Sequence, residues 1–203
     1  MRLIIATKNK NKFKEIKDIL KDLPIEVIYL GEINKNFKIK EDGKSFFDNA
    51  LKKAMVVSKF YPEDFVVGED SGIEVDYLNK RPGIFSARYA GLNATDIENN
   101  LKLLNEINGV AKSKRKAHYR CYLVLVKGGK LVNKFFGSWS GYINDKLVGK
   151  NGFGYDPIFY LPLYKKTAAQ LTLEEKNRIS HRAKAFRKLK GYLSNNFLKK
   201  TFS

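Results

Sequence analysis

The sequence predicts an α/β protein built on a mixed β-sheet, and three observations carry that prediction. Apolar strand patterns alternate with amphipathic helix patterns through the first half of the chain. In the second half, Gly128-Gly129 separates two long strand patterns, which is typical of an antiparallel hairpin. No internal repeat or linker interrupts the 203 residues, so we expect one domain over residues 1–203. This arrangement leaves room for two lobes around a cleft.

Composition excludes several classes of protein. Hydrophobic residues make up 43% of the chain, and no apolar run approaches the roughly 18 residues of a membrane span. The N-terminal apolar run is too short for a signal peptide. The single cysteine, Cys121, forms no internal disulfide, and no histidine–cysteine cluster suggests zinc. We therefore expect a cytoplasmic protein.

The charge balance is strongly basic, with 39 Lys and Arg against 21 Asp and Glu and a formal net charge of +18. Such an excess attracts polyanions, either a nucleic-acid backbone or small phosphorylated ligands. Most lysines are spread along predicted helices and the C-terminal tail rather than gathered in one stripe. The charge favours an anionic partner without choosing one.

The first predicted strand, residues 3–6, meets the first predicted helix at a lysine-rich turn. That turn reads Thr7-Lys8-Asn9-Lys10-Asn11-Lys12. Thr7 or Asn9 can cap the helix, and the free N–H groups of a helix N-terminus attract anions. The turn suits a triphosphate, although an ordinary capped helix start explains the same residues.

A second strand is predicted at residues 25–30, followed by a polar loop that ends in Lys40-Glu41-Asp42-Gly43. Ser45 caps the next predicted helix. The expected core face of that helix consists of Phe47, Ala50, Leu51, Ala54, Met55 and Ser58. Asn49 and Lys53 lie four residues apart and share one face. Lys53 is either a solvated charge or a phosphate ligand.

The strand predicted from Phe65 ends in two adjacent acids, Glu69 and Asp70. A Ser-Gly turn and a second strand from Ile73 are predicted to follow. An unpaired buried carboxylate costs several kcal/mol or gives up its charge, so paired acids at a strand end are unusual. They suit Mg²⁺, which takes oxygen ligands and shares substrate phosphates. A solvated acidic turn explains the same residues equally well.

The second half of the sequence adds two candidate ligand-binding segments. Residues 149–157 contain three glycines, two aromatic residues and one acid, which allows close backbone approach and ring stacking. Thr172 to Glu175 matches a capping box. Ser180 is expected to cap the last helix, which places His181 and Arg182 in its first turn. A basic pair there opposes the helix dipole and is easier to understand beside a ligand.

Six segments in this order resemble one family. They are Ala6-Thr7-x-Asn9-x-x-Lys12, Phe46-x-Asp48-Asn49-Ala50-x-x-Lys53-Ala54, Glu69-Asp70-Ser71-Gly72, Pro82-Gly83-x-x-Ser86-Ala87-Arg88-Tyr89, Gly152-Phe153-Gly154-Tyr155-Asp156-Pro157 and Leu171-Thr172-x-Glu174-Glu175-Lys176-x-x-Ile179-Ser180-His181-Arg182. Together they closely resemble the inosine/xanthosine triphosphate pyrophosphatases, over residues 3 to about 189.

The resemblance implies hydrolysis of ITP, dITP and XTP to the monophosphate and pyrophosphate, with Mg²⁺, in a homodimer. It also implies a long, mixed, curved sheet flanked by helices, with two lobes around the substrate cleft. Asp70 would be the catalytic base and, with Glu41, a metal ligand. Lys53 and residues 7–12 would bind phosphates, and Ser71 would bind substrate beside the acids. The base pocket would consist of Phe153, Gly154, Tyr155, Asp156, Lys176, His181 and Arg182.

The chain departs from the family pattern at three positions. Lys8 and Asn11 stand where the family commonly has glycine, and Glu69-Asp70 replaces the commoner Asp-Asp. The longer Glu69 side chain leaves its role open. In the expected reaction, Asp70 takes a proton from a water that attacks the α-phosphorus, and pyrophosphate leaves.

Selectivity is expected at the purine 6-position. A 6-keto oxygen accepts from donors such as Lys176, His181 or Arg182, whereas the adenine amino group leaves a buried donor unpaired, at about 1–3 kcal/mol. Excluding guanine needs a contact at position 2, for which Asp156 and simple crowding are the candidates.

Two other functions compete. A nucleic-acid-binding module would need a continuous basic stripe, and a Maf-like pyrophosphatase would not carry the Ser180-His181-Arg182 and Gly152–Pro157 segments. We therefore expect no stable nucleic-acid partner.

Overall fold

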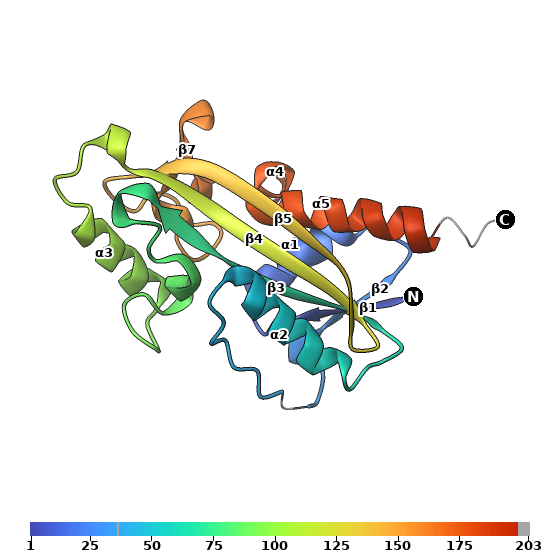
Figure 1. Ribbon diagram of the computed structural model, residues 1–203. Helices are drawn as coiled ribbons and strands as arrows, with labels where there is room; N and C mark the ends of the chain where they lie inside the picture. Colours follow the sequence, from blue (N-terminus) through green and yellow to red (C-terminus); the bar gives the residue numbers. More distant parts are fainter. Residues whose placement is uncertain (36, 199–203) are drawn as a thin grey trace. The chain divides into compact units, whose positions relative to one another are not determined.

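The structure is a computed structural model and describes residues 1–35 and 37–198 (Figure 1). Its seven-stranded sheet has the order β2-β1-β3-β4-β5-β6-β7. The strands are β1 (Arg2–Ala6), β2 (Glu26–Tyr29), β3 (Phe65–Val75), β4 (Lys116–Lys127), β5 (Lys130–Ile143), β6 (Phe159–Leu161) and β7 (Lys166–Thr167). β1 pairs in parallel with β2 and β3, whereas β6 pairs antiparallel with β5 and β7. The predicted mixed α/β sheet flanked by helices is confirmed.

The α-helices are α1 (Lys10–Leu20), α2 (Phe46–Ser58), α3 (Asp96–Glu106), α4 (Leu173–Ile179) and α5 (His181–Leu193). Two predicted N-caps are present: the Asn9 side chain accepts from the Lys12 N–H, and that of Ser45 accepts from the Asp48 N–H. Thr172 and Glu175 form the predicted capping box at the start of α4. No helix among the described residues is long and apolar enough to cross a membrane.

The chain divides into two compact units. Unit 1 comprises Met1–Asp70, Cys121–Gly137 and the described part of His181–Ser203, and unit 2 comprises Ser71–Arg120 and Ser138–Ser180. The chain passes between them four times, and β3, β4 and β5 each contribute residues to both units. The single domain expected over residues 1–203 stays a prediction.

In unit 1, helices cover both faces of the sheet, because successive strand side chains point to opposite faces. One face packs with α1 and α5 through Leu3, Ile5, Phe65, Val67, Cys121, Leu123 and Leu125. The other face packs with α2 through Ile4, Ala6, Val66, Val124 and Val126. Figure 1 shows α2 and α5 on opposite sides of these strands.

Two glycines set how closely the helices of unit 1 lie on their strands. A Cβ at Gly68 of β3 would overlap the carbonyl oxygen of Ala50 in α2, and a Cβ at Gly137 of β5 would overlap that of His181 in α5. Both strands therefore contact helix backbone directly. These contacts fix the distance of α2 from β3 and of α5 from β5.

Unit 2 has its own core around aromatic rings of three strands. The Tyr119 and Phe159 ring centroids are 4.7 Å apart, and those of Trp139 and Phe159 are 5.2 Å apart. Leu103 and Ile107, at the end of α3, pack into the same cluster. Tyr155, in the loop at residues 149–157, and Ile158, which follows this loop, belong to the same cluster and anchor the loop to the core.

The structure contradicts two details of the sequence prediction. β3 runs unbroken through Glu69-Asp70-Ser71-Gly72, so the predicted turn at these residues is wrong. In α2 the buried face is rotated from the predicted one: Asn49 and Lys53 are buried, while Phe47, Leu51 and Met55 are half-buried. In both places polar residues are buried with partners: Glu69 and Asp70 on β3, and Asn49 and Lys53 on α2.

Candidate functional site

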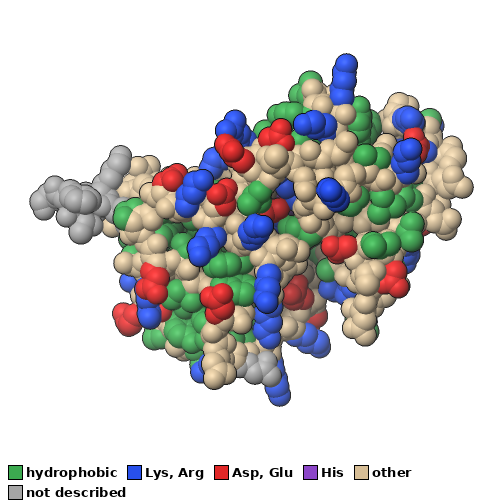
Figure 2. All heavy atoms as spheres, turned by 180° about the vertical axis from the view of Figure 1, so that it is seen from behind, with side chains coloured by type: hydrophobic (Ala, Val, Ile, Leu, Met, Phe, Trp, Pro, Cys, Tyr) green, Lys and Arg blue, Asp and Glu red, His purple; other side chains and the backbone are tan. Residues whose placement is uncertain are grey.

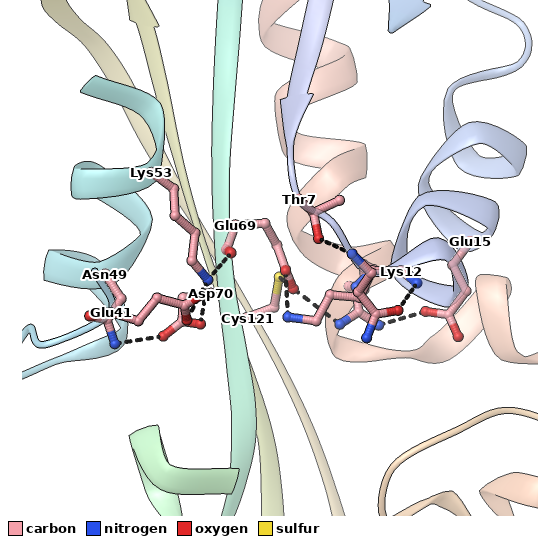
Figure 3. Close-up of polar contacts among 11 residues, drawn as sticks. Thr7, Lys12, Glu15, Glu41, Asn49, Lys53, Glu69, Asp70 and Cys121 are labelled. Atoms are coloured by element: carbon pink, nitrogen blue, oxygen red, sulfur yellow. Dashed lines mark hydrogen bonds and ion pairs between the residues drawn. The ribbon is translucent and has the colours of Figure 1, made fainter. Parts of the chain in front are cut away.

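Glu69 and Asp70 are neighbours on β3, and their side chains point to opposite faces of the strand (Figure 3). Asp70 faces α2 together with Glu41, Asn49 and Lys53. Glu69 faces the side of α1 and α5. The acid pair therefore makes two separate polar clusters within unit 1.

The Asp70 carboxylate is buried and held at both oxygens. Lys53 Nζ donates to Asp70 Oδ1 at 3.0 Å, and Asn49 Nδ2 donates to Oδ2 at 3.1 Å. Lys53 Nζ also donates to the Glu69 carbonyl at 3.1 Å and lies 2.8 Å from Glu41 Oε2. Asn49 and Lys53 reach Asp70 together because they share one face of α2, as predicted.

Burial and charge act against each other at Asp70 and Lys53. Burial raises the pKa of Asp70, and the nearby Lys53 and Lys12 charges oppose this rise without reversing it. Burial alone would lower the pKa of Lys53, but Asp70 and Glu41 raise it above its ordinary value. At neutral pH the cluster therefore holds an ammonium beside a carboxylate that accepts protons more readily than an ordinary aspartate.

Glu69 is a fully buried anion between two cations. Its Oε2 accepts from Lys12 Nζ at 2.7 Å and its Oε1 from Arg182 Nη2 at 3.0 Å. Arg182 Nη1 also donates to Glu15 Oε2 at 2.6 Å. Burial alone would raise the pKa of Glu69, but the charges of Lys12 and Arg182 outweigh it and hold that pKa well below its ordinary value. Glu69 thus ties the start of α1 to the first turn of α5.

The turn at residues 7–12 is an ordered helix start. Asn9 Oδ1 accepts from the Lys12 N–H at 3.0 Å, and Thr7 Oγ1 accepts from the Asn9 N–H at 3.2 Å. Tyr29 donates to the Lys8 carbonyl at 2.6 Å. Thr7 is buried and Lys12 half-buried, whereas the exposed residues are Lys8, Asn9, Lys10 and Asn11. The turn presents two exposed lysines at a helix N-terminus, which attracts anions.

In unit 2, Asp156 organises the Gly-aromatic loop from inside. Its carboxylate accepts from the Phe153 N–H at 2.9 Å and the Tyr119 hydroxyl at 3.2 Å, and it forms an ion pair with Lys176. Gly152 has a φ of 73°, and a Cβ there would overlap this carboxylate. Asp156 is buried, so it shapes the loop and holds Lys176 rather than facing solvent.

The two aromatic residues of that loop have different places. Tyr155 is buried in the core of unit 2, and its hydroxyl donates to the Ser86 carbonyl at 2.8 Å. Phe153 is half-buried, and Lys176 Nζ lies 4.9 Å from its ring centroid. The neighbouring Gly154 is held by Asp96, whose Oδ2 accepts from the Gly154 N–H at 2.7 Å. Of the two rings, that of Phe153 is the more exposed.

The structure divides the predicted site residues between the units. Unit 1 holds Thr7, Lys8, Asn9, Lys10, Asn11, Lys12, Glu41, Lys53, Asp70, His181 and Arg182, and unit 2 holds Ser71, Phe153, Gly154, Tyr155, Asp156 and Lys176. It brings Asp70, Lys53 and Glu41 together in one cluster and Phe153, Asp156 and Lys176 in another. The guanidinium of Arg182, an expected pocket donor, is held by two buried carboxylates, those of Glu15 and Glu69.

Sequence reasoning missed two contacts. Asn49 was paired with Lys53 by spacing, but nothing in the sequence indicated that it donates to Asp70. Glu15 and Arg182 are 167 residues apart, so no local pattern could join them.

A divalent cation is the cofactor that the family resemblance implies. Among the described residues, no group of three or more His, Cys, Asp or Glu could hold a metal ion. Two carboxylates do converge, however: those of Glu41 and Asp70 both lie within 3.0 Å of one ammonium nitrogen. Mg²⁺ is commonly held by one or two carboxylates together with substrate phosphates. The donor set fits Mg²⁺ completed by a substrate.

Comparisons with known proteins agree on one family. The sequence model of the Ham1 family matches residues 3–192. The dITP/XTP pyrophosphatase of Clostridium perfringens is 47% identical over 199 residues, which cover 95% of this chain and 97% of the relative. That of Caldanaerobacter subterraneus subsp. tengcongensis is 47% identical over 193 residues, covering 95% and 96%. The solved Ham1 protein of Staphylococcus aureus is 39% identical, with a TM-score of 0.85 and coverage of 96% and 99%.

Proposed function

The chain belongs to the Ham1 family, and we propose that it is a hydrolase of noncanonical purine nucleoside triphosphates, ITP, dITP and XTP. The products are the nucleoside monophosphate and pyrophosphate. The observation that carries the proposal is the buried Asp70 carboxylate, which has a raised pKa and is held by Lys53 and Asn49 beside Glu41. The names of the 47%-identical relatives support the same substrate class.

Asp70 is the proposed base. Its carboxylate takes a proton from a water whose oxygen forms the new bond to the α-phosphorus, while the bond to the leaving pyrophosphate breaks. In the substrate-free protein, Asn49 and Lys53 fix the orientation of the carboxylate by donating to both of its oxygens. Mg²⁺, held by Glu41, Asp70 and the substrate, would supply positive charge to stabilise the negative charge that develops on the phosphate oxygens.

The turn at residues 7–12 is the proposed triphosphate site. The exposed Lys8 and Lys10 and the free N–H groups at the start of α1 offset the phosphate charge. Lys12 is kept near by its ion pair with Glu69. Lys53 is a further proposed phosphate ligand.

Phe153 and Lys176 are the proposed base-recognition residues of unit 2. The Phe153 ring offers a stacking face, and Lys176, fixed by Asp156, donates to a 6-keto oxygen. The adenine amino group offers no acceptor to the N–H that would meet the keto oxygen, which costs about 1–3 kcal/mol and corresponds to roughly 5- to 150-fold discrimination. Ser71, His181 and Arg182 remain predicted substrate-binding residues. Arg182 pairs with two carboxylates and Lys176 with one, which favours Lys176 as the keto donor.

We also propose a homodimer and a cytoplasmic location. Apolar side chains lie exposed on α3 and the preceding segment of unit 2, namely Phe85, Leu92, Ile97 and Leu101. Exposed apolar groups of this kind are typical of a subunit interface. A mass twice the 23.3 kDa of the chain in light scattering is the expected result, and a monomer contradicts it. The free, buried Cys121 fits a reducing compartment, which cell fractionation tests.

One assay tests the activity: pyrophosphate release with Mg²⁺ from ITP, dITP, XTP, GTP, ATP, dTTP and UTP. Turnover of the first three is expected, with ATP slower by roughly 5- to 150-fold and loss of turnover on chelation of the metal. Asp70→Asn should lower kcat by about 10²–10⁴-fold. Asp22→Asn, an exposed acid paired with Lys190, is the matched control and should keep full activity.

Several outcomes contradict the proposal. Equal turnover of ATP, or no turnover of any nucleotide, defeats the substrate class. Near-normal turnover by Asp70→Asn, in a protein with an unchanged circular dichroism spectrum, defeats the assignment of the base.

A further inference from the structure

Lys53 occupies the point where the two proposed metal-binding acids meet. Its Nζ lies 2.8 Å from Glu41 Oε2 and 3.0 Å from Asp70 Oδ1, and it donates to the Glu69 carbonyl at 3.1 Å. Figure 3 shows the side chain descending from α2 to end between the two carboxylates. The ammonium thus stands among three oxygens, two of them anionic.

This environment satisfies the ammonium fully. A lysine has three N–H donors, and three oxygens surround the Lys53 nitrogen. Its side chain is only 9% exposed, so it depends on these oxygens in place of water. The same oxygens are hard donors of the kind that Mg²⁺ prefers. An ammonium and a divalent cation would therefore compete for one place.

We propose that Lys53 is the resident cation of this site when no substrate is bound, and that it leaves Glu41 and Asp70 when a divalent cation binds there with the nucleotide. This inference rests on the proposed function. Lys53 needs only side-chain rotations to leave, because its four methylene groups are flexible while α2 stays packed on Gly68. A triphosphate gives the displaced ammonium a new anionic partner, so metal and nucleotide should each strengthen the binding of the other.

Two consequences distinguish a resident cation from a simple phosphate ligand. Before substrate arrives, Lys53 neutralises Glu41 and Asp70 and keeps them close together. Lys53 also weakens the binding of metal in the absence of nucleotide. The metal must displace the ammonium, which then has no phosphate to pair with. A lysine that only contacts phosphate would have no effect on metal binding in the absence of nucleotide.

The test measures metal binding to the nucleotide-free protein. Mn²⁺, whose paramagnetism reports binding directly, is titrated into the wild type, Lys53→Met and Lys53→Gln. We expect both variants to bind Mn²⁺ at least tenfold more tightly than the wild type. We also expect Mn²⁺ to raise their melting temperatures more than that of the wild type, because metal replaces the lost positive charge between the two acids.

Lys52→Met is the matched control. Lys52 is the preceding residue of α2, and it is exposed and pairs with the exposed Asp42 rather than with Glu41 or Asp70, so its loss should leave Mn²⁺ affinity unchanged. If Lys53→Met does not fold without metal, Lys53→Gln provides the measurement, since its amide still donates to two of the oxygens. Unchanged Mn²⁺ affinity in the folded variants overturns the inference. Pyrophosphate release by the wild type is measured separately, so failure of this inference is distinct from failure of the proposed function.

Discussion

Asp70 and Glu69 show how two adjacent carboxylates acquire opposite properties on one strand. Both are buried, but Asp70 faces one ammonium, one amide and the acid Glu41, whereas Glu69 lies between two cations. Burial therefore dominates at Asp70 and raises its pKa, and charge dominates at Glu69 and lowers its pKa. The first suits a base and the second a permanent structural anion.

Asn49→Asp tests the proton balance at Asp70. The new carboxylate can still accept from the Gly43 N–H, as Asn49 does, but it replaces the donor to Asp70 with a second acid. Two acids at this distance share a proton, so the pKa of Asp70 rises further. Because the base acts deprotonated, the acid limb of the kcat/KM profile should move to higher pH by about one unit or more.

The profile is measured from about pH 5 to pH 9 with ITP. Asn133→Asp, which adds the same charge beside Lys134 on β5, is the control and should leave the acid limb in place. An unmoved limb in Asn49→Asp would show that Asp70 is not the group whose deprotonation controls the rate.

At the level of single residues, the family resemblance indicated Glu41, Lys53 and Asp70, and the structure brings these three together. Their roles stay predictions. The sequence left Glu69 open because its partners, Lys12 and Arg182, lie 57 and 113 residues away. Tyr155 and Asp156 are predicted pocket residues; the structure shows both buried and shaping the loop, and their pocket roles stay predictions. Burial depends on the tertiary fold, which local spacing does not contain.

At the level of elements, α2 and β3 build the Asp70 cluster by direct backbone contact. The sequence predicts both elements. It also predicts an interruption of β3 at Glu69-Asp70-Ser71-Gly72, because these residues are typical of turns, whereas the strand is continuous. In the structure the ion pairs of the two acids and the neighbouring strands hold the extended conformation instead. Tertiary partners outweigh local preference here.

Gly68→Ala tests the contact between α2 and β3. The added methyl group would overlap the Ala50 carbonyl, and the atoms that it meets are all backbone of α2, which leaves little room to adjust. We expect a loss of about 1–3 kcal/mol in the free energy of unfolding, together with lower activity, because α2 carries Lys53. Urea denaturation measures the loss.

Gly191→Ala in α5 is the opposite control. No atom lies within 4 Å of its added Cβ, and alanine favours the helix, so the variant should be more stable by about 0.5–1 kcal/mol. Equal stability of Gly68→Ala and the wild type would mean that the close approach is not needed.

At the level of the whole molecule, the sequence gives the net charge but not which charged side chains form ion pairs. Composition indicated an anionic partner from the net charge of +18, but it could not distinguish paired from unpaired lysines. Lys12, Lys53 and Lys176 each pair with a buried acid. In Figure 2 the basic side chains on the visible face are interspersed with acidic ones rather than gathered in one stripe. On this face the pattern attracts a compact anion more readily than it fits a long polyanion.

The ionic strength dependence of kcat/KM distinguishes attraction of the substrate by the net charge of the molecule from attraction by the lysines of the turn at residues 7–12. The substrate is a polyanion, and salt screens its attraction to exposed lysines, so kcat/KM for ITP should fall by roughly tenfold as KCl rises from about 0.05 to 0.5 M. We expect Lys8→Gln/Lys10→Gln to lose most of this dependence, because these side chains are exposed at the start of α1. Lys116→Gln/Lys130→Gln removes the same charge from other exposed positions and should keep it. If both pairs respond equally, the net charge of the molecule draws the substrate in and the turn at residues 7–12 has no special part.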